Sequence, residues 1–250
     1  MKNVLFAVAL VSTFASSKAL AQEAAAEPNA LTFNAAVTSD YRYRGISQTR
    51  LQPAVQGGAD FTNEPSGLYV GIWASTIKWT KDAGGSGDVE IDLYGGKRGD
   101  IGQGFGYDVG VLTYVYPSNG LAHVSGFANA NTTELYGQLS YGPGSLKYSH
   151  AVSNLFGFVD SKNSGYLDLS VNPELVKDVT LNLHVGRQRV ANNGAASYTD
   201  WKVGVTHDFG VVTGALAYIG TNAGKVAYAS PANGKFLGKS ALQLTISKTF

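Results

Sequence analysis

The sequence predicts an all-β protein: a transmembrane, antiparallel, up-and-down β-barrel of about twelve strands that follows a cleaved N-terminal signal peptide. Three observations lead to this fold class. Short segments with alternating apolar and polar residues run through the chain, and the connections between them are alternately short and long. The last segment alternates as well and finishes on an aromatic residue, Phe250, as the closing strand of an outer-membrane barrel does.

The first residues have the three parts of a secretory signal peptide. A positively charged start precedes an apolar run over residues 4–14, and Ala19-Leu20-Ala21 forms a small-x-small cleavage site. The apolar run is too short to span a bilayer as a helix. We therefore expect cleavage after Ala21, a disordered leader over residues 22–29 and one barrel domain over residues 30–250.

Composition excludes several classes of function. Charged residues make up 15% of the chain and the formal net charge is +1, which argues against a nucleic-acid-binding surface. The absence of cysteine fits an exported protein that needs no disulfide. The four histidines are scattered, so we expect no metal site and no cofactor.

Each predicted strand rests on a row of apolar residues at every second position, the period of a strand with one apolar face. In chain order, the strands and their rows are 31–44 (Leu31, Phe33, Val37), 53–62 (Val55, Phe61), 67–77 (Leu68, Val70, Ile72), 88–96 (Val89, Ile91, Leu93), 104–116 (Phe105, Val109, Val111), 132–141 (Leu135, Leu139), 145–152 (Leu146, Tyr148), 165–171 (Leu167, Leu169, Val171), 178–189 (Val179, Leu181, Leu183), 198–209 (Val203, Val205), 211–220 (Val212, Leu216) and 239–250 (Leu242, Leu244, Ile246).

The lengths of the connections indicate a barrel rather than a soluble β-sandwich. Short connections follow the even-numbered strands, at 63–66, 99–102, 142–144, 172–177 and 209–211. Long ones follow the odd-numbered strands, at 45–51, 78–86, 117–131, 153–164, 190–197 and 221–237. Outer-membrane barrels have tight periplasmic turns and longer outer loops, whereas a sandwich has no reason to alternate in this way. The last strand should pair with the first and leave no free edge.

In such a barrel the apolar rows face lipid, because every backbone polar group must be satisfied inside the bilayer by the closed sheet. Aromatic residues near strand ends would form the interfacial girdles. The predicted membrane-interface aromatics are Tyr41, Tyr43, Tyr107, Tyr141, Trp201, Phe209, Tyr218 and Phe250. Arg187 and Arg189 are in phase with the lipid-facing row at the outer end of their strand. They would either reach anionic lipid headgroups or form a solvated strand end.

The opposite rows predict a charged lumen. The predicted pore-lining residues are Asp40, Arg42, Arg44, Asp60, Glu90, Asp92, Asp108, Glu134, Lys147, Asp168, Lys202 and Asp208. We expect Arg42 and Arg44 to form a small basic ladder on the first strand, opposite an acidic wall. The excess of acids predicts a mild preference for cations. Alternatively, these charges only pair and brace a closed barrel.

Several motifs resemble the TorF-like porin family of proteobacteria. They are the segment Thr38-Ser39-Asp40-Tyr41-Arg42-Tyr43-Arg44-Gly45-Ile46-Ser47-Gln48-Thr49, the segment Gly67-Leu68-Tyr69-Val70-Gly71-Ile72-Trp73-Ala74-Ser75, the segment Glu90-Ile91-Asp92-Leu93-Tyr94-Gly95-Gly96 and the segment Asp200-Trp201-Lys202-Val203-Gly204. The chain departs from the family pattern at Lys97-Arg98, where an aromatic residue often follows the glycine pair. The resemblance implies an outer-membrane barrel with a pore function and names no solute.

The function predicted from these features is passive diffusion of small hydrophilic solutes or ions through the outer membrane. The expected partners are outer-membrane lipids, the permeating solutes and the barrel-assembly machinery, which would recognise the C-terminal strand ending in Phe250. Two alternatives stay open: a non-conducting structural or adhesive barrel, and, less favoured, a lipid hydrolase. The hydrolase needs a Ser and a His together on the outer face, but His150 points outward while Ser149 points inward. We expect no enzyme activity, and the sequence does not indicate the oligomeric state.

Overall fold

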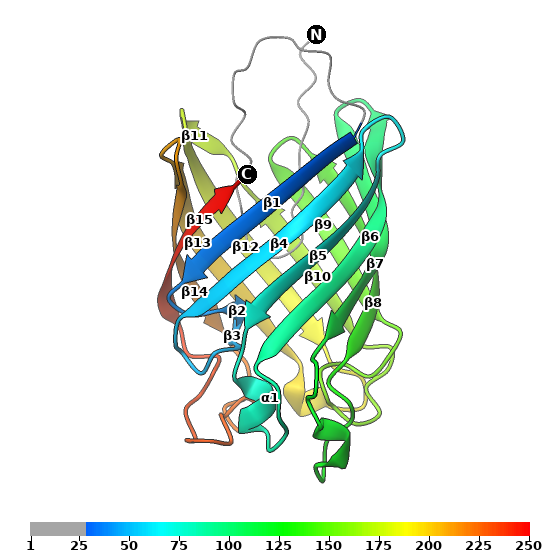
Figure 1. Ribbon diagram of the computed structural model, residues 1–250, viewed down its shortest axis with the longest axis vertical. Coiled ribbons are helices and arrows are strands. Elements are labelled where there is room, and N and C mark those ends of the chain that lie inside the picture. The colour runs from blue at the N-terminus through cyan, green and yellow to red at the C-terminus, as the bar shows by residue number, and fades with distance from the viewer. Residues whose placement is uncertain (1–28) are drawn as a thin grey trace.

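The computed structural model describes residues 29–250, which form a closed antiparallel β-barrel (Figure 1). Its twelve long strands are β1 (Asn29–Thr38), β4 (Ala54–Asn63), β5 (Leu68–Thr76), β6 (Val89–Gly102), β7 (Phe105–Val115), β8 (Thr132–Tyr141), β9 (Gly144–Ala151), β10 (Gly165–Val171), β12 (Val179–Arg189), β13 (Tyr198–Asp208), β14 (Thr213–Thr221) and β15 (Ala241–Thr249). The short elements are β2 (Arg42–Tyr43), β3 (Ile46–Ser47), β11 (Glu174–Val176), the helical turn α1 (Trp79–Asp82) and the 3₁₀ turns η1 (Leu121–His123) and η2 (Gly194–Ala196).

Strand order around the barrel follows the chain. Each long strand pairs with the next, and β15 returns to β1, with pairs from Asn34↔Thr249 to Thr38↔Thr245. The barrel therefore has no free edge along these strands, which confirms the predicted return of the last strand to the first.

The two ends of the barrel differ in the length of their connections. The end where β1 begins and β15 finishes also carries the tight turns, and we call it the short-turn end. One of these turns consists of Gly142 and Pro143 between β8 and β9, and Gly142 has a φ of 53°, which suits the first position of a type II′ hairpin turn. The opposite, long-loop end carries α1, η1, η2 and the longer connections (Figure 1).

The side chains separate by strand parity, as predicted. On β12, for example, Val185 is 44% exposed on the outer face, whereas its neighbour His184 points inward and contacts Asp200. The outer face is apolar along the strands, and the interior is lined by tyrosines, charged residues and small polar residues. A polar interior with an apolar exterior is the inverse of a soluble core.

The first strand is shorter than the sequence predicts. The alternation continues to Arg44, but β1 ends at Thr38 and the chain then turns into the barrel (Figure 1). Tyr41 and Tyr43 were expected on the outer face; instead Tyr41 is 1% exposed and both pack in an internal cluster with Tyr114. The prediction of these two residues as interfacial aromatics is therefore wrong.

Other boundaries move by less. The fourth long strand, β6, continues through Lys97 and Arg98 to Gly102, so these two residues belong to the strand and not to the turn that follows it. Asn29 already belongs to β1, whereas the predicted signal peptide, its cleavage site after Ala21 and the leader residues 22–28 lie outside the described residues. No helix within residues 29–250 is long and apolar enough to cross a membrane.

Candidate functional site

The charged residues of the lumen are the candidate functional site. Each residue predicted to line the pore lies inside the barrel, in the inward-facing row of its strand or in the loop that follows β1. The same alternation also puts Arg98 and Asp200 on the inner face, although neither is among the predicted pore-lining residues. With these two, the described lumen has nine acids, namely Asp40, Asp60, Glu90, Asp92, Asp108, Glu134, Asp168, Asp200 and Asp208, and five bases, namely Arg42, Arg44, Arg98, Lys147 and Lys202.

Residues 39–53, which we call the inward loop, enter the lumen from the long-loop end. Within this loop β2 and β3 form a two-stranded hairpin, with the pairs Arg42↔Ser47 and Tyr43↔Ile46. The turn between them consists of Arg44 and Gly45, whose φ angles are 47° and 77°. Positive φ at both central residues is the signature of a type I′ turn, which matches the twist of a tight hairpin. The hairpin therefore presents Arg44 at its tip.

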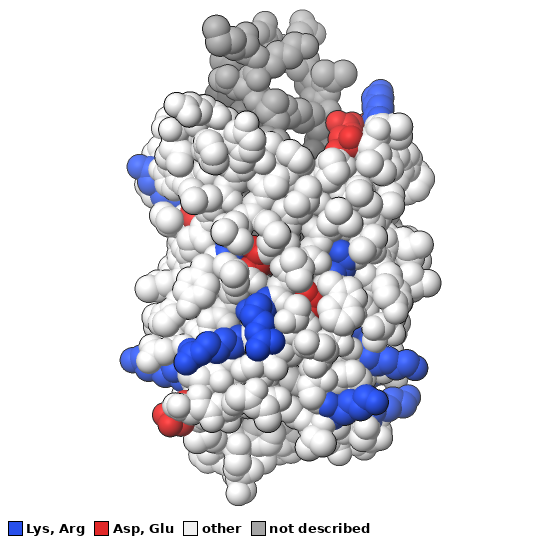
Figure 2. All heavy atoms as spheres, turned by 180° about the vertical axis from the view of Figure 1, so that it is seen from behind, with Lys and Arg blue, Asp and Glu red and all other residues white. Residues whose placement is uncertain are grey.

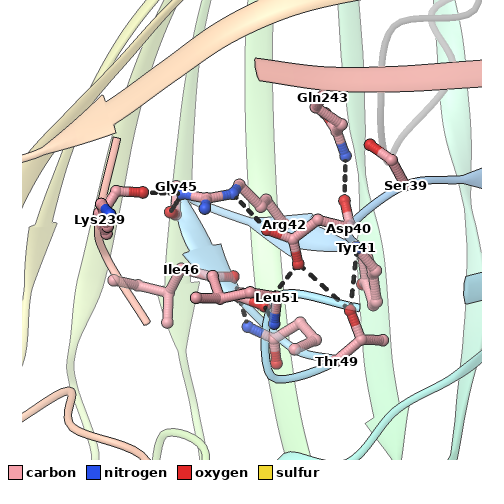
Figure 3. A network of polar contacts seen from close by, with 12 residues as sticks. Ser39, Asp40, Tyr41, Arg42, Gly45, Ile46, Thr49, Leu51, Lys239 and Gln243 are labelled. Atoms are coloured by element: carbon pink, nitrogen blue, oxygen red, sulfur yellow. Dashed lines mark hydrogen bonds and ion pairs between the residues drawn. The ribbon is translucent and has the colours of Figure 1, made fainter. Parts of the chain in front are cut away.

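Asp40 holds the inward loop in shape (Figure 3). Its Oδ2 accepts a hydrogen bond from Nε of Arg42 at 2.7 Å, and its Oδ1 accepts from the hydroxyls of Ser47 at 2.5 Å and Thr49 at 3.2 Å. Both members of the Asp40–Arg42 pair are buried, and hydrogen bonds to the carboxylate oxygens offset the cost of burying that charge. The expected basic ladder is therefore wrong for Arg42, which pairs with its neighbour in the chain rather than with a facing wall.

The same loop is tied to the last strand and the segment before it. The Asp40 carbonyl accepts from Nε2 of Gln243 at 2.6 Å, and Nη1 of Arg42 donates to the Lys239 carbonyl at 2.7 Å (Figure 3). The backbone N–H of Ser47 donates to the Leu237 carbonyl at 3.0 Å. The hairpin is thus anchored on the β15 side of the barrel.

From this anchor, Arg44 reaches the other side of the lumen. Its guanidinium donates two hydrogen bonds to Glu134 on β8, at 3.0 and 2.7 Å, and one to Gln188 on β12 at 2.7 Å. It also lies over the ring of Tyr166, 4.2 Å from the centroid. Since β8 and β15 are on opposite sides of the ring of strands, the Arg44–Glu134 ion pair bridges the lumen. Arg44 therefore pairs with one acid of the facing side, Glu134, and it reaches that acid from a loop rather than from the first strand.

Loops at the long-loop end are joined to one another as well. Nε of Arg50 donates to Oδ2 of Asp82 at 2.7 Å, and the Ser230 hydroxyl donates to the same oxygen at 3.2 Å. The hydrogen bond to Asp82 raises the pKa of Arg50 above its usual value, because it favours the charged guanidinium. These contacts connect the inward loop, α1 and the loop between β14 and β15.

Luminal tyrosines lie flat over glycines of neighbouring strands. A Cβ added at Gly71 would meet the Tyr94 ring at 2.3 Å, and one at Gly110 would meet the Tyr136 hydroxyl at 2.4 Å. Gly186 receives Tyr166 in the same way, with 1.9 Å from the ideal Cβ to the Tyr166 Oη. Only a residue without a side chain leaves room for a ring against the wall. The glycines therefore keep these aromatic rings out of the centre of the lumen.

The tyrosine hydroxyls are bonded to the luminal acids. Tyr94 donates to Asp60 at 2.5 Å, and Tyr69 donates to Asp108 at 2.5 Å. Lys147 lies 4.1 Å from the centroid of the Tyr136 ring. Phenol donors satisfy part of the hydrogen-bonding capacity of these carboxylates without neutralising their charge.

His184 is part of a polar cluster inside the lumen. Its Nε2 lies 2.8 Å from Oδ1 of Asp200, and its Nδ1 lies 3.3 Å from Oδ1 of Asp168. Tyr166 donates to Asp200 at 2.9 Å. Asp168 is the more accessible of the two acids, with 27% of its side chain exposed, against 2% for Asp200.

The lumen wall made by β14, β15 and β1 differs from the tyrosine-lined wall. Its inward residues are small, and they include Ala215, Ala217, Thr245, Ser247 and Ala36. At the long-loop end the inward loop covers this wall, because Gly45 lies so close to Thr221 that an added Cβ would be 2.4 Å from its Cγ2. The wall of small side chains thus continues toward the short-turn end beyond the inward loop.

The remaining predicted interfacial aromatics lie on the outer face. Tyr141, Phe209 and Phe250 are 60–66% exposed near the short-turn end, and Tyr107 is partly exposed at that end. Trp201 and Tyr218 are 37% and 50% exposed nearer the long-loop end. These positions fit two girdles; the contact with lipid stays a prediction. On the same outer face, the His150 ring lies beside the Tyr148 ring.

Solved structures of porins have a fold similar to that of this barrel. The structure of the KdgM porin matches with a TM-score of 0.52 at 6% identity, covering 88% of this chain and 97% of that chain. The NanC porin matches with a TM-score of 0.53 at 12% identity, covering 88% and 98%. A KdgM porin in complex with disordered oligogalacturonate gives 0.50 at 6% identity, covering 88% and 97%. At these identities the likeness shows the fold alone.

The sequence itself identifies the family. The chain belongs to a family described as bacterial protein of unknown function (Gcw_chp), whose sequence model matches residues 21–250. No curated protein matches the sequence. The resemblance to the TorF-like porins is not confirmed by these comparisons.

Proposed function

We propose that this protein is a porin-like channel of the bacterial outer membrane, through which small hydrophilic solutes or ions diffuse passively with a mild preference for cations. The observation that carries the proposal is the combination of an apolar outer face with a closed, polar interior that holds nine acids and five bases. A wall of this kind spans a membrane without unsatisfied backbone groups and encloses a charged water path.

The preference for cations follows from the arrangement of the luminal charges. Two of the bases, Arg42 and Arg44, are bound in ion pairs with Asp40 and Glu134. Acids such as Asp60, Asp108 and Asp168 line the path between the inward loop and the short-turn end. An excess of one sign inside a low-dielectric wall raises the local concentration of the opposite ion.

The proposed location and partners follow from the same architecture. The apolar outer face fits outer-membrane lipids, and the strand that ends near Phe250 fits recognition by the barrel-assembly machinery. The TorF-like resemblance supports a pore. Oligogalacturonate is the ligand of the KdgM complex and is not carried over to this chain.

A non-conducting barrel is the second candidate, and one observation favours it: the Arg44–Glu134 bridge crosses the lumen. The two candidates separate in a planar-bilayer recording of the refolded chain, residues 22–250, under a salt gradient. Discrete current steps with a reversal potential on the cation side support the channel. Silence from a preparation whose circular dichroism shows a folded barrel supports the structural barrel, and a reversal potential on the anion side contradicts the selectivity. The same preparation after heat denaturation is the control for leakage.

A further inference from the structure

A basic pair on the outer face of β12 lies directly above an apolar groove. Arg187 and Arg189 are exposed, they belong to the outward row of β12 and they lie at its long-loop end. Nη1 of Arg187 donates to the Thr199 hydroxyl at 3.3 Å, and Nη1 of Arg189 donates to the Asn163 carbonyl at 3.1 Å. Each guanidinium has further N–H donors, since one group carries five.

Neighbouring strands add a rim to this pair. In the register of the sheet, Arg189 faces Gly165, which faces His150 on β9, and Arg187 faces Leu167, which faces Tyr148. Gly165 leaves room for the Tyr148 ring, because a Cβ there would meet its hydroxyl at 2.5 Å. Exposed Lys162 adjoins Asn163 in the loop above. Two arginines, a lysine, a histidine and a tyrosine thus border one small area of the outer face.

Below the basic pair, the outer face is hollowed. A groove of about 210 Å³ is bordered by apolar side chains of β10, β12 and β13, with His184 and Lys202 of the luminal row at its floor. The apolar residues are Leu169, Val171, Leu183, Val185, Trp201 and Val203. Val185 is two positions from Arg187 on the same face, a separation of about 7 Å. The groove therefore begins where the basic pair ends.

The charge of this end of the barrel is distinct from that of the opposite end. Apart from the luminal acids and bases named above, the described residues of the long-loop end include nine bases, namely Arg50, Lys78, Lys81, Lys162, Arg187, Arg189, Lys225, Lys235 and Lys239, and three acids, namely Asp82, Asp88 and Asp160. The short-turn end has three bases, Lys97, Lys177 and Lys248, and four acids, Glu64, Asp100, Glu174 and Asp178. Figure 2 shows Lys and Arg gathered toward the long-loop end of one side of the barrel, with little Asp or Glu beside them.

We propose that Arg187 and Arg189 bind the phosphate groups of one lipopolysaccharide molecule in the outer leaflet, and that the groove below them receives one of its acyl chains. Guanidinium groups match phosphate oxygens in geometry and charge. Basic residues at the edge of an apolar membrane surface bind anionic headgroups, and Trp201 and Tyr148 are placed as the amphipathic rings of that level. This inference rests on the proposed outer-membrane location, with the long-loop end facing outward.

The test measures the binding of lipid A to the refolded chain, residues 22–250, in detergent micelles by calorimetric titration. Bisphosphorylated lipid A is compared with the same lipid after removal of its phosphates. The Arg187→Gln/Arg189→Gln variant should bind the phosphorylated lipid at least about tenfold more weakly, and Arg187→Lys/Arg189→Lys should recover part of the loss. The matched control, Lys97→Gln/Lys248→Gln, removes the same charge from the short-turn end and should bind like the wild type.

Equal binding of the two lipids by the wild type would overturn the inference, as would an equal loss in the control variant. Current through the channel is recorded separately for the same variants. A protein that binds lipid A but never conducts would contradict the proposed channel and leave the lipid site standing. A protein that conducts normally but binds both forms of lipid A equally would contradict the lipid site and leave the proposed channel standing.

Discussion

The two halves of the lumen are built differently. In the half near the long-loop end, the inward loop rests on the wall of small residues and extends Arg44 across to Glu134 on β8. In the half near the short-turn end, tyrosines such as Tyr94 lie flat over glycines, and the opposite wall shows small residues such as Ala215. The same barrel is therefore narrowed by a loop in one half and kept wide by its glycines in the other. We infer that the half near the long-loop end sets the single-channel conductance and that the half near the short-turn end sets the selectivity between cations and anions.

The largest expected effect comes from removing the hairpin that makes the halves different. Replacement of residues 42–47 by a Gly-Ser linker of equal length should raise single-channel conductance roughly two- to fivefold, because the bridge and its aromatic neighbours leave the lumen. Recordings in planar bilayers measure this. An equal replacement in the loop over residues 231–235 is the control, and an unchanged current in the hairpin variant would mean that the inward loop does not limit flow.

Loosening the loop without removing it should have a smaller effect. Asp40→Ala removes the acceptor of Arg42, Ser47 and Thr49, at a cost of about 1–3 kcal/mol to the closed loop. We expect a noisy current with brief steps to a higher level, since the loop then leaves its position part of the time. Asp160→Ala, in an exposed loop, should keep the steady wild-type trace. A steady trace from Asp40→Ala as well would show that other contacts suffice to hold the loop.

Ion selectivity should change through residues of the other half. Asp60→Asn/Asp108→Asn removes two negative charges near the short-turn end, and the cation-to-anion permeability ratio should fall by about half with little change in conductance. Lys147→Gln/Lys202→Gln should move the ratio in the opposite direction. Reversal potentials under a salt gradient measure both variants, and a shift of the same sign in the two would rule out an effect of luminal charge.

The smallest expected effect comes from the glycines over which the luminal tyrosines lie. Gly186→Ala places a Cβ 1.9 Å from the Tyr166 hydroxyl, so the ring must move away from the wall and toward Arg44. We expect conductance to drop by about a third. At Gly137 the same change meets its nearest atom at 3.9 Å, and this variant should conduct normally. Should both variants conduct alike, the position of the ring would be irrelevant to flow.

Strand parity could be predicted because it is a local property of the sequence. Period-two alternation placed Asp60, Glu90 and Asp108 inside. The same rule also places Asp200 inside when it is applied to every position of that strand. The alternation of short and long connections indicated the barrel and its strand number for the same reason. Each signal is contained within one strand or one turn.

The inward loop could not be predicted in this way. Alternation continues past Thr38 to Arg44 without a break, although the chain leaves the sheet at Ser39. What turns the chain inward is a set of contacts with residues far along the sequence, such as Gln243 with Asp40 and Glu134 with Arg44. The Arg44-Gly45 pair was a hint, since a two-residue turn with glycine is typical of a tight hairpin.

The bridge between Arg44 and Glu134 is the contact on which the account depends most. A charge-swap cycle tests it directly, through the single-channel conductance of Arg44→Glu, Glu134→Arg and the double variant. We predict that each single change raises conductance, because two like charges push the hairpin from the wall, and that the double variant returns to about the wild-type value. Equal conductance in all four proteins would contradict a lumen narrowed by this ion pair. So would a double variant whose conductance is raised by the sum of the two single effects.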